Sequence, residues 1–371
     1  MERQKKIALA GPYISQKEIE YVVDAAKNGW YETYDMHIKK LEETFAHLVG
    51  ARHAIATFCG THALHLAALA LDLKDGDEVI LPDISCIASA FAISYTGAKC
   101  VFVDIDPETL CIDPEQAERA ITPKTKAIMA VDFSGYSAEM DEIKTIAARH
   151  NLKTIEDACQ AVGSKYRGRH CGTTADIGCY SFQGSKICVG GEGGMLVTDD
   201  DDLYEKALHY GTFCRNDAIR FLWSDDIGYG YRISNITAAL ILAQVERLDE
   251  LIARKKMIFE WYEKYMSGIE GVKLLRPNAD CTCNYSYAVC ILDDRFALKK
   301  ERILIEMLAD NVHMRPGYPP MSLMPNYERH FAVPNADHYF RNSITLPTAM
   351  NLTEDDISYV CARLDQMLRE K

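Results

Sequence analysis

The sequence predicts an α/β fold, with a large domain built on a mostly parallel sheet and a small α+β domain after it. Short apolar strands alternate with amphipathic helices from about residue 60 to 200, which is the pattern of parallel β-α-β units. From residue 234 this alternation gives way to a long amphipathic run. We therefore expect a large domain over 1–245, with an N-terminal arm over 1–15, and a small C-terminal domain over 246–371.

The elements of the large domain follow from apolar periodicity and turn residues. The segments with the apolar content of helices are 61–71, 88–97, 114–121 and 140–150. The segments that predict strands are 77–82, 99–105, 126–133, 153–158, 178–182 and 194–198. Ligands of such sheets bind beyond the carboxyl ends of the strands, where Asp157, Ser181 and Lys186 stand.

The small domain is predicted in the same way. The run 233–265 indicates one helix or two in series that lead the chain out of the first domain. The remainder is expected to form a strand over 284–292, a helix over 297–310, a strand over 343–347 and a final helix over 353–368. This order is typical of an α+β unit.

Composition excludes several classes of protein. There are 54 acidic and 41 basic residues, for a formal charge of −13, and no Lys/Arg run, so we expect no nucleic-acid partner. The 13 cysteines are scattered without a CxxC pair, which indicates free thiols and no metal site. The N-terminus has only a short apolar stretch, and no apolar run reaches the roughly 18 residues of a membrane helix. We expect a cytoplasmic protein without a membrane segment.

Lys186 lies in SFQGSKICVGGEGGM, between small residues and just ahead of a double-glycine loop. Lysine attacks carbonyl groups only when part of it is neutral, and burial or nearby positive charge promotes this by lowering its pKa. The glycines would let the backbone and a cofactor approach closely. The alternative is a solvated surface lysine, because lysine is rarely buried without a partner.

Two further motifs share the strand-end edge. Asp157 ends an apolar strand, where it would either keep a pyridinium nitrogen protonated or cap a following helix. Gly60 and Thr61 open a helix whose free N–H groups suit a phosphate, although Gly-Thr is also an ordinary helix start. A phosphate site, a carboxylate for a ring nitrogen and a Schiff-base lysine together meet the requirements of pyridoxal phosphate (PLP).

The sequence also resembles a known family over nearly its whole length. GTHALHLAALAL, DGDEVILP, IEDACQAVGSKYRG, SFQGSK, GGEGGMLVT and GYGYRISNITAALILAQ occur in the order found in the DegT/DnrJ/EryC1/StrS nucleotide-sugar aminotransferases. The resemblance implies PLP fold type I, the fold of aspartate aminotransferase. It also implies PLP as cofactor, with pyridoxamine phosphate as the intermediate form.

The resemblance assigns a role to each matching residue. Lys186 would bind PLP covalently and then move protons, Asp157 would pair with the pyridine nitrogen, and Gln160 would lie near the ring hydroxyl. The residues expected to hold the phosphate are Gly60, Thr61 and Ser181. Asn235 matches an asparagine that reaches the cofactor phosphate of the neighbouring subunit, which implies a homodimer with shared active sites.

The substrate is also inferred from the resemblance. WSDDIGYGYRISN and RPGYPPMSLMPNY are most similar to members that aminate C4 of a nucleotide-linked 4-keto-6-deoxyhexose, with GDP-linked sugars the most similar case. Glutamate is the implied amino donor. Lys186 disfavours the deoxygenating members, which have histidine there. The alternatives are a UDP- or dTDP-linked 4-keto sugar, a 3-keto sugar, a cyclitol ketone, or a non-catalytic PLP-binding regulatory protein.

Three positions depart from the family pattern. Cys86 stands where relatives have an aromatic residue that stacks on the cofactor ring, so cofactor affinity or ring tilt is expected to differ. The VHLYGHP segment of many relatives is VDFSGYS here, with Asp132, Ser134 and Tyr136. Ser322 stands in a loop that often carries a histidine. We expect the last two changes to alter the sugar or nucleotide pocket.

The remaining candidates are side chains that could contact substrate. Trp30 and Tyr31 would line the nucleotide-sugar cleft or simply pack. Arg315 would meet a phosphate of the substrate or serve as a surface residue, and Tyr318 lies in the same segment. A histidine pair over residues 62–65 is expected to pack rather than to bind metal, because no third ligand accompanies it.

Overall fold

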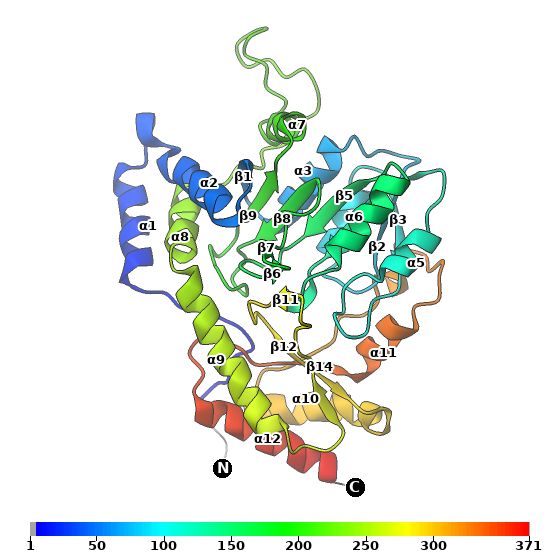
Figure 1. Cartoon of the computed structure of the whole chain (residues 1–371). Helices are drawn as coiled ribbons and strands as arrows, with labels where there is room; N and C mark the ends of the chain where they lie inside the picture. The colour runs from blue at the N-terminus through cyan, green and yellow to red at the C-terminus, as the bar shows by residue number, and fades with distance from the viewer. Residues whose placement is uncertain (1–4, 371) are drawn as a thin grey trace.

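The structure, a computed structural model, describes residues 5–370 and has a central seven-stranded sheet in the order β1-β9-β8-β5-β4-β2-β3 (Figure 1). The five strands from β8 to β3 in this order are parallel, and β9 is antiparallel to both of its neighbours. The bounds are β1 His53–Thr57, β2 Glu78–Pro82, β3 Lys99–Val103, β4 Thr125–Val131, β5 Lys153–Asp157, β8 Ile177–Ser181 and β9 Gly194–Thr198. The predicted α/β class is confirmed.

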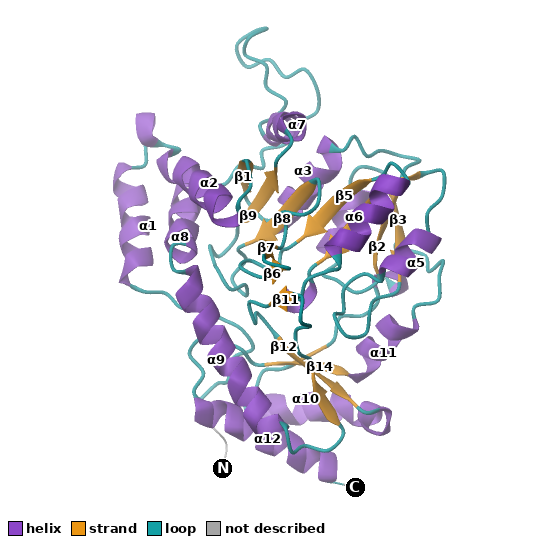
Figure 2. Cartoon of the chain, viewed as in Figure 1, coloured by secondary structure: helices purple, strands orange, loops and turns teal. Residues whose placement is uncertain are grey.

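Helices cover both faces of this sheet (Figure 2). Alternate residues of a strand serve opposite faces, so Val79 and Leu81 of β2 pack with α3, α4 and α7, while Ile80 packs with α5 and α6. The helices are α1 Gln16–Asn28, α2 Met36–Val49, α3 Gly60–Ala70, α4 Ala88–Ser94, α5 Pro114–Arg119, α6 Met140–Arg149, α7 Asp201–Gly211 and α8 Asn235–Val245. The packing of helices on both faces of the sheet fixes where the carboxyl ends of the parallel strands lie.

The run over 233–265 forms two helices in series, α8 and α9 (Leu248–Met266). Beyond them lies a four-stranded sheet in the order β10-β12-β14-β13. Its elements are β10 Val272–Leu274, β12 Ala288–Leu292, α10 Lys300–Ala309, β13 Arg315–Pro316, α11 Pro334–Asn342, β14 Ser343–Leu346 and α12 Glu354–Arg369. A three-stranded sheet of β11 Cys281–Thr282, β6 Lys165–Tyr166 and β7 Arg169–His170 joins the two parts.

The N-terminal segment runs along the C-terminal part of the molecule before α1 begins. Ile7 donates its N–H to the carbonyl of Asn311, and its own carbonyl accepts from the N–H of His313, both at 2.9 Å. Residues 1–4 of the expected arm lie outside the described residues. Among residues 5–370 no helix combines the length and apolarity required to cross a bilayer.

One predicted element is wrong in its first half. The expected strand over 284–292 begins only at Ala288. Tyr285 has a φ of 55°, and the Asn284 side chain donates to the carbonyls of Gln160 and Val162 at 3.0 and 2.9 Å. The backbone therefore turns here instead of extending, and the Asn284 side chain contacts the large domain.

Candidate active site

A cavity of about 400 Å³ opens at the carboxyl ends of the parallel strands. It is lined from the large sheet, from the start of α3, from the loop between β8 and β9, and from the C-terminal part of the chain. The predicted site residues that line it are Gly60, Thr61, Cys86, Asp157, Gln160, Ser181, Lys186, Arg315 and Tyr318. Residues separated by more than 250 positions thus converge on one space.

Lys186 is held by a tight loop between β8 and β9. Its N–H donates to the carbonyl of Gln183 at 2.8 Å, and Gly190 N–H donates to the carbonyl of Phe182 at 2.7 Å. Gly193 has a φ of 140°, and a Cβ there would lie 2.5 Å from Cδ1 of Ile241, so only glycine fits. The loop therefore fixes where the lysine side chain enters the cavity.

The electrostatics at Lys186 correct the sequence argument. Burial lowers the pKa of Lys186, but the Tyr287 phenol, then Cys159 and Tyr318, raise it, and the net direction is upward. The pKa is therefore not lowered, because the phenols and thiols outweigh the effect of burial. An adjacent acceptor is therefore needed to take the ammonium proton before the amine can attack a carbonyl.

Asp157 ends β5 and is 4% exposed. Its Oδ2 accepts from Oγ of Ser89 at 2.6 Å, and its Oδ1 accepts from the N–H of Cys159 at 3.1 Å. No helix follows Asp157 within residues 158–164, so the helix-cap alternative is wrong. The carboxylate is held by two donors and faces the cavity, as a partner for a protonated ring nitrogen would.

The start of α3 suits an anion. No side chain caps its N-terminus, so the first N–H groups of the helix are available to a ligand. A Cβ on Gly60 would lie 2.9 Å from Cβ of Ser181 and 3.0 Å from Sγ of Cys159. The glycine therefore keeps this end of the cavity open, with the Ser181 hydroxyl beside it.

Gln160 is oriented by a turn that follows β4. Its Oε1 accepts from the N–H of Ser134 at 3.0 Å, and its main-chain carbonyl accepts from Nδ2 of Asn284. Ser134 has a φ of 58°, which is unfavourable for a residue other than glycine. Gln160 is thus anchored by the turn at Ser134 and by Asn284, which belongs to the C-terminal part of the chain.

The structure brings three predicted residues to no part of this cavity. Trp30 donates its ring N–H to the carbonyl of Ala26, and Tyr31 is 88% exposed. Asn235 accepts from the N–H of His37 at 2.8 Å, and its Nδ2 is buried without a partner in the described chain. Within one chain these side chains do not reach Lys186, and their roles remain predictions.

The departures from the family pattern divide into two groups. Cys86 lines the cavity, whereas Asp132, Ser134, Tyr136 and Ser322 are buried and do not. Ser322 donates its Oγ to Asp83 at 2.5 Å. These four side chains do not line the cavity of the single chain, and the expectation that they alter the sugar or nucleotide pocket stays a prediction.

Sequence reasoning missed Tyr287, which lines the cavity opposite Lys186. Its hydroxyl lies 3.3 Å from Oγ of Ser185, and the Arg315 guanidinium lies 5.7 Å from its ring centre. Burial raises the pKa of Tyr287, but the charge of Lys186 and the hydrogen bond with Ser185 lower it overall. A tyrosine inside a predicted strand carries no local signal of such a contact.

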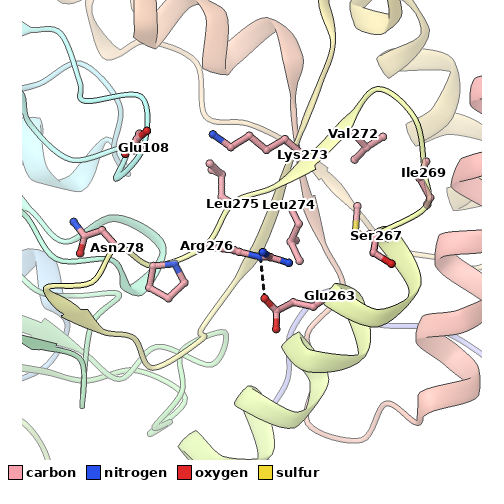
Figure 3. A pocket seen from close by; sticks show the side chains of 12 residues that line it. Glu108, Glu263, Ser267, Ile269, Val272, Lys273, Leu274, Leu275, Arg276 and Asn278 are labelled. Carbon is pink, nitrogen blue, oxygen red and sulfur yellow. Dashed lines mark ion pairs between the residues drawn. The ribbon is translucent and has the colours of Figure 1, made fainter.

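A second cavity, of about 450 Å³, lies beside α9 and β10 (Figure 3). Arg276 pairs there with Glu263 at 2.9 Å. None of the predicted site residues lines it. The chemistry-bearing groups are therefore concentrated in the Lys186 cavity.

The donor set of that cavity fits PLP. An amine, a held carboxylate and an uncapped helix start with a neighbouring hydroxyl match the aldehyde, the ring nitrogen and the phosphate of the cofactor. No aromatic side chain stands at position 86, so the Cys86 thiol would meet the ring of a bound cofactor there.

Comparisons with known proteins agree with a PLP site. Residues 12–365 match the DegT/DnrJ/EryC1/StrS aminotransferase family. The chain is 39% identical to a GDP-perosamine synthase of Caulobacter vibrioides, over 98% of each chain. It is 38% identical to a GDP-perosamine synthase of Escherichia coli O157:H7, over 99% of this chain and 100% of that one. A putative pyridoxal phosphate-dependent aminotransferase of Bacillus subtilis, EpsN, is 33% identical over 95% and 93% of the two chains.

Solved structures share the fold. DesI, crystallised in the presence of its TDP-sugar product, superimposes with a TM-score of 0.92 at 27% identity, over 99% of this chain and 94% of that one. The aminotransferase TlmJ of Streptoalloteichus hindustanus gives a TM-score of 0.91 at 27% identity, over 98% of each chain.

Proposed function

Because the chain belongs to the DegT/DnrJ/EryC1/StrS aminotransferase family, we propose that it transfers an amino group from glutamate to C4 of a GDP-linked 4-keto-6-deoxyhexose. The chain is a PLP-dependent sugar aminotransferase of fold type I. The observation that carries the finer proposal is the convergence of Lys186, Asp157 and the start of α3 in one cavity of a chain this similar to GDP-perosamine synthases.

The residues of the cavity have separate tasks in this proposal. Bound PLP supplies an electron sink for negative charge that develops on the substrate carbon beside the nitrogen. Lys186 holds the cofactor covalently and, once displaced by substrate, moves a proton at its Nζ atom. Asp157, fixed by Ser89 and Cys159, keeps the ring nitrogen protonated.

The other residues bind and orient. The N–H groups at Gly60 and Thr61, with the Ser181 hydroxyl, hold the phosphate. Gln160 lies beside the ring, supported by the N–H of Ser134. Tyr287 lies opposite Lys186, where its oxygen suits a transient proton acceptor.

We also propose a homodimer with shared active sites. The buried, unpartnered Nδ2 of Asn235 and the exposed rings of Trp30 and Tyr31 support it, because none of these groups lines the cavity of its own chain. The described cysteines are all free thiols, which supports a cytoplasmic location. Light scattering in solution tests the assembly, and a mass of one chain would contradict it.

The function is tested with purified protein, glutamate and GDP-, UDP- and dTDP-linked 4-keto-6-deoxyhexoses. We expect an amino sugar product and equimolar 2-oxoglutarate from wild type, fastest with the GDP-linked substrate, and none from Lys186→Ala. Product only from another nucleotide sugar, a 3-keto sugar or a cyclitol ketone would contradict the substrate but not the reaction. Cofactor binding without turnover of any amino donor would indicate a regulatory protein.

A further inference from the structure

Two carboxyl groups are buried together behind the cavity, at the ends of neighbouring strands. Asp132 follows β4 and Glu156 lies in β5, and both are 0% exposed. Oδ1 of Asp132 accepts from the N–H of Ala138 at 2.9 Å. Oε2 of Glu156 accepts from the N–H groups of Thr174 and Ala175 at 3.0 and 3.3 Å. Each carboxyl group therefore has one oxygen that accepts hydrogen bonds from backbone N–H groups.

The other two oxygens have no such donor. Oδ2 of Asp132 and Oε1 of Glu156 are buried and receive no N–H or O–H from any described residue. A carboxyl oxygen of Asp132 nevertheless lies within 4.8 Å of a carboxyl oxygen of Glu156. Two ionised carboxylates so close together in a buried site would repel each other, and one proton held between them removes this repulsion.

We propose that Asp132 donates a shared proton to Glu156, and that this hydrogen bond holds the turn that orients Gln160 toward the cavity. The negative charge belongs on Glu156, because its carboxylate accepts several backbone N–H groups whereas Asp132 accepts one.

The consequence for the site runs through the backbone. The N–H of Asp132 donates to the carbonyl of Asp157 at 3.0 Å, and two residues later the N–H of Ser134 donates to Gln160. Ser134 has a positive φ, so the turn needs outside support to persist. The shared proton supplies that support by tying Asp132, at the start of the turn, to Glu156. Asp132 is therefore a positioning residue rather than a catalytic one. This role depends on the proposed function only because the proposed function places Gln160 beside the cofactor ring.

Burial raises the pKa of both Asp132 and Glu156. The other titratable groups that face the pair are thiols and a phenol: Cys111, Cys171, Cys281 and Tyr180. Burial raises the pKa of three of these, while hydrogen bonds from Cys283 and Ser137 lower that of Cys281 to about 7. Cys281 is therefore the group whose titration has to be separated from that of the pair.

The signs of the pH dependence follow from the raised pKa of Asp132. The folded protein binds a proton that the unfolded chain has already released, so stability falls as pH rises toward the folded pKa. Asn at position 132 donates from Nδ2 to Glu156 at every pH. Asp132→Asn should therefore keep the turn and lose this part of the pH dependence.

The experiment uses the cofactor-loaded protein in a Cys281→Ser background. We expect the infrared band of a protonated carboxyl group at neutral pH, lost in Asp132→Asn but retained in the control Asp141→Asn, whose carboxylate is exposed and paired with Arg167 and Arg169. As pH rises above the ordinary pKa of an aspartate, the melting temperature should fall more steeply in Asp141→Asn than in Asp132→Asn. Asp132→Leu, which cannot donate, should weaken cofactor binding at least tenfold where Asp132→Asn does not.

Two results would overturn the proposal. One is the same protonated-carboxyl band in Asp132→Asn as in the parent. The other is a metal ion retained at one per chain after dialysis against a chelator and lost in Asp132→Asn, since Asp132, Glu156 and Cys171 have ligand atoms within 4.8 Å of one another. A metal would then be the bridge between the carboxylates.

Discussion

At the scale of single residues, the sequence pattern predicts most of the side chains on which the site depends, but it does not predict one of them. Lys186, Asp157 and Gly60 are recognisable because the edge of a parallel sheet restricts where chemistry can lie. Tyr287 is not, because a turn around Asn284 places it opposite Lys186. Such a contact depends on how two distant segments pack, which no local pattern encodes.

Tyr287→Phe should lower the pKa of Lys186. The phenol is the largest influence that raises this pKa, and phenylalanine removes it while keeping the ring. The rate at which the apoprotein takes up PLP, followed by absorbance against pH, should then have its midpoint at lower pH. Tyr285→Phe is the control, since Tyr285 packs on Phe259 and does not line the cavity. An unchanged midpoint in Tyr287→Phe would contradict the assignment.

Gly60→Ala should weaken PLP binding by tenfold or more. The new Cβ would lie 2.9 Å from Cβ of Ser181, so the start of α3 must move away from the phosphate. The dissociation constant is measured by titrating the apoprotein with PLP. Gly268→Ala serves as the control because a Cβ there meets nothing within 4 Å. Equal affinities in the two variants would place the phosphate elsewhere.

At the scale of elements, most predicted segments match a helix or strand, but α1, α2, α7, α11 and β1 were not predicted, and neither were the two-residue strands. β6, β7, β11 and β13 have only two residues each, too few for a periodicity to register. The pairing of β11 with β6 nevertheless joins the two parts of the chain. The positions of these short strands are set by tertiary packing, so the sequence could predict the α/β class but not how the C-terminal part meets the sheet.

Glu18 anchors α1, and Glu18→Gln should destabilise the protein. Glu18 completes the capping box with Ser15 and accepts from Gln244 at 2.6 Å and Arg247 at 2.5 Å while fully buried. Removing its charge leaves Arg247 short of a buried partner, which costs about 3 kcal/mol in the free energy of unfolding. Glu250→Gln, which breaks the exposed half of the same pair, should cost less than about 1 kcal/mol. Urea denaturation measures both, and equal losses would contradict the prediction.

Glu18 also gives a pH dependence to test. Burial raises its pKa, but the hydrogen bonds from Ser15 and Gln244 lower it to about 2. A depressed pKa means that the stability from Glu18 is present above its ordinary range near 4.5 and is lost as pH falls toward 2. In Glu18→Gln the free energy of unfolding should therefore fall less steeply over this acidic window than in wild type. Parallel curves would contradict the prediction.

At the scale of the whole molecule, we propose that the chain divides near residue 245, between α8 and α9. The two parts are linked beside the cavity by Asp83, which follows β2 and accepts from the N–H and Oγ of Ser322 at 2.7 and 2.5 Å. Arg329 donates to Oγ of Ser322 at 2.9 Å. The link holds the C-terminal side of the cavity against the large sheet.

Asp83→Asn should remove a pH dependence from this link. Burial raises the pKa of Asp83 to about 6, and the hydrogen bonds from Ser322 oppose this. The folded state thus holds a proton between pH 3.8 and about 6 that the unfolded chain has lost, so stability falls as pH rises through this window. Thermal unfolding against pH should be flatter here in Asp83→Asn than in wild type. Equal slopes would show that Asp83 does not titrate there.

The pairing of the N-terminal segment has a consequence for how the molecule is made. Lys5 forms an ion pair with Asp356, 351 positions later, and Ile7 bridges to Val312. On the ribosome, Lys5 and Ile7 emerge long before Val312 and Asp356, so their contacts must wait for those residues. Closing so long a loop is slow relative to local helix formation. These contacts should therefore form late, and Ile7, which is buried in the folded protein, is exposed to aggregation until then.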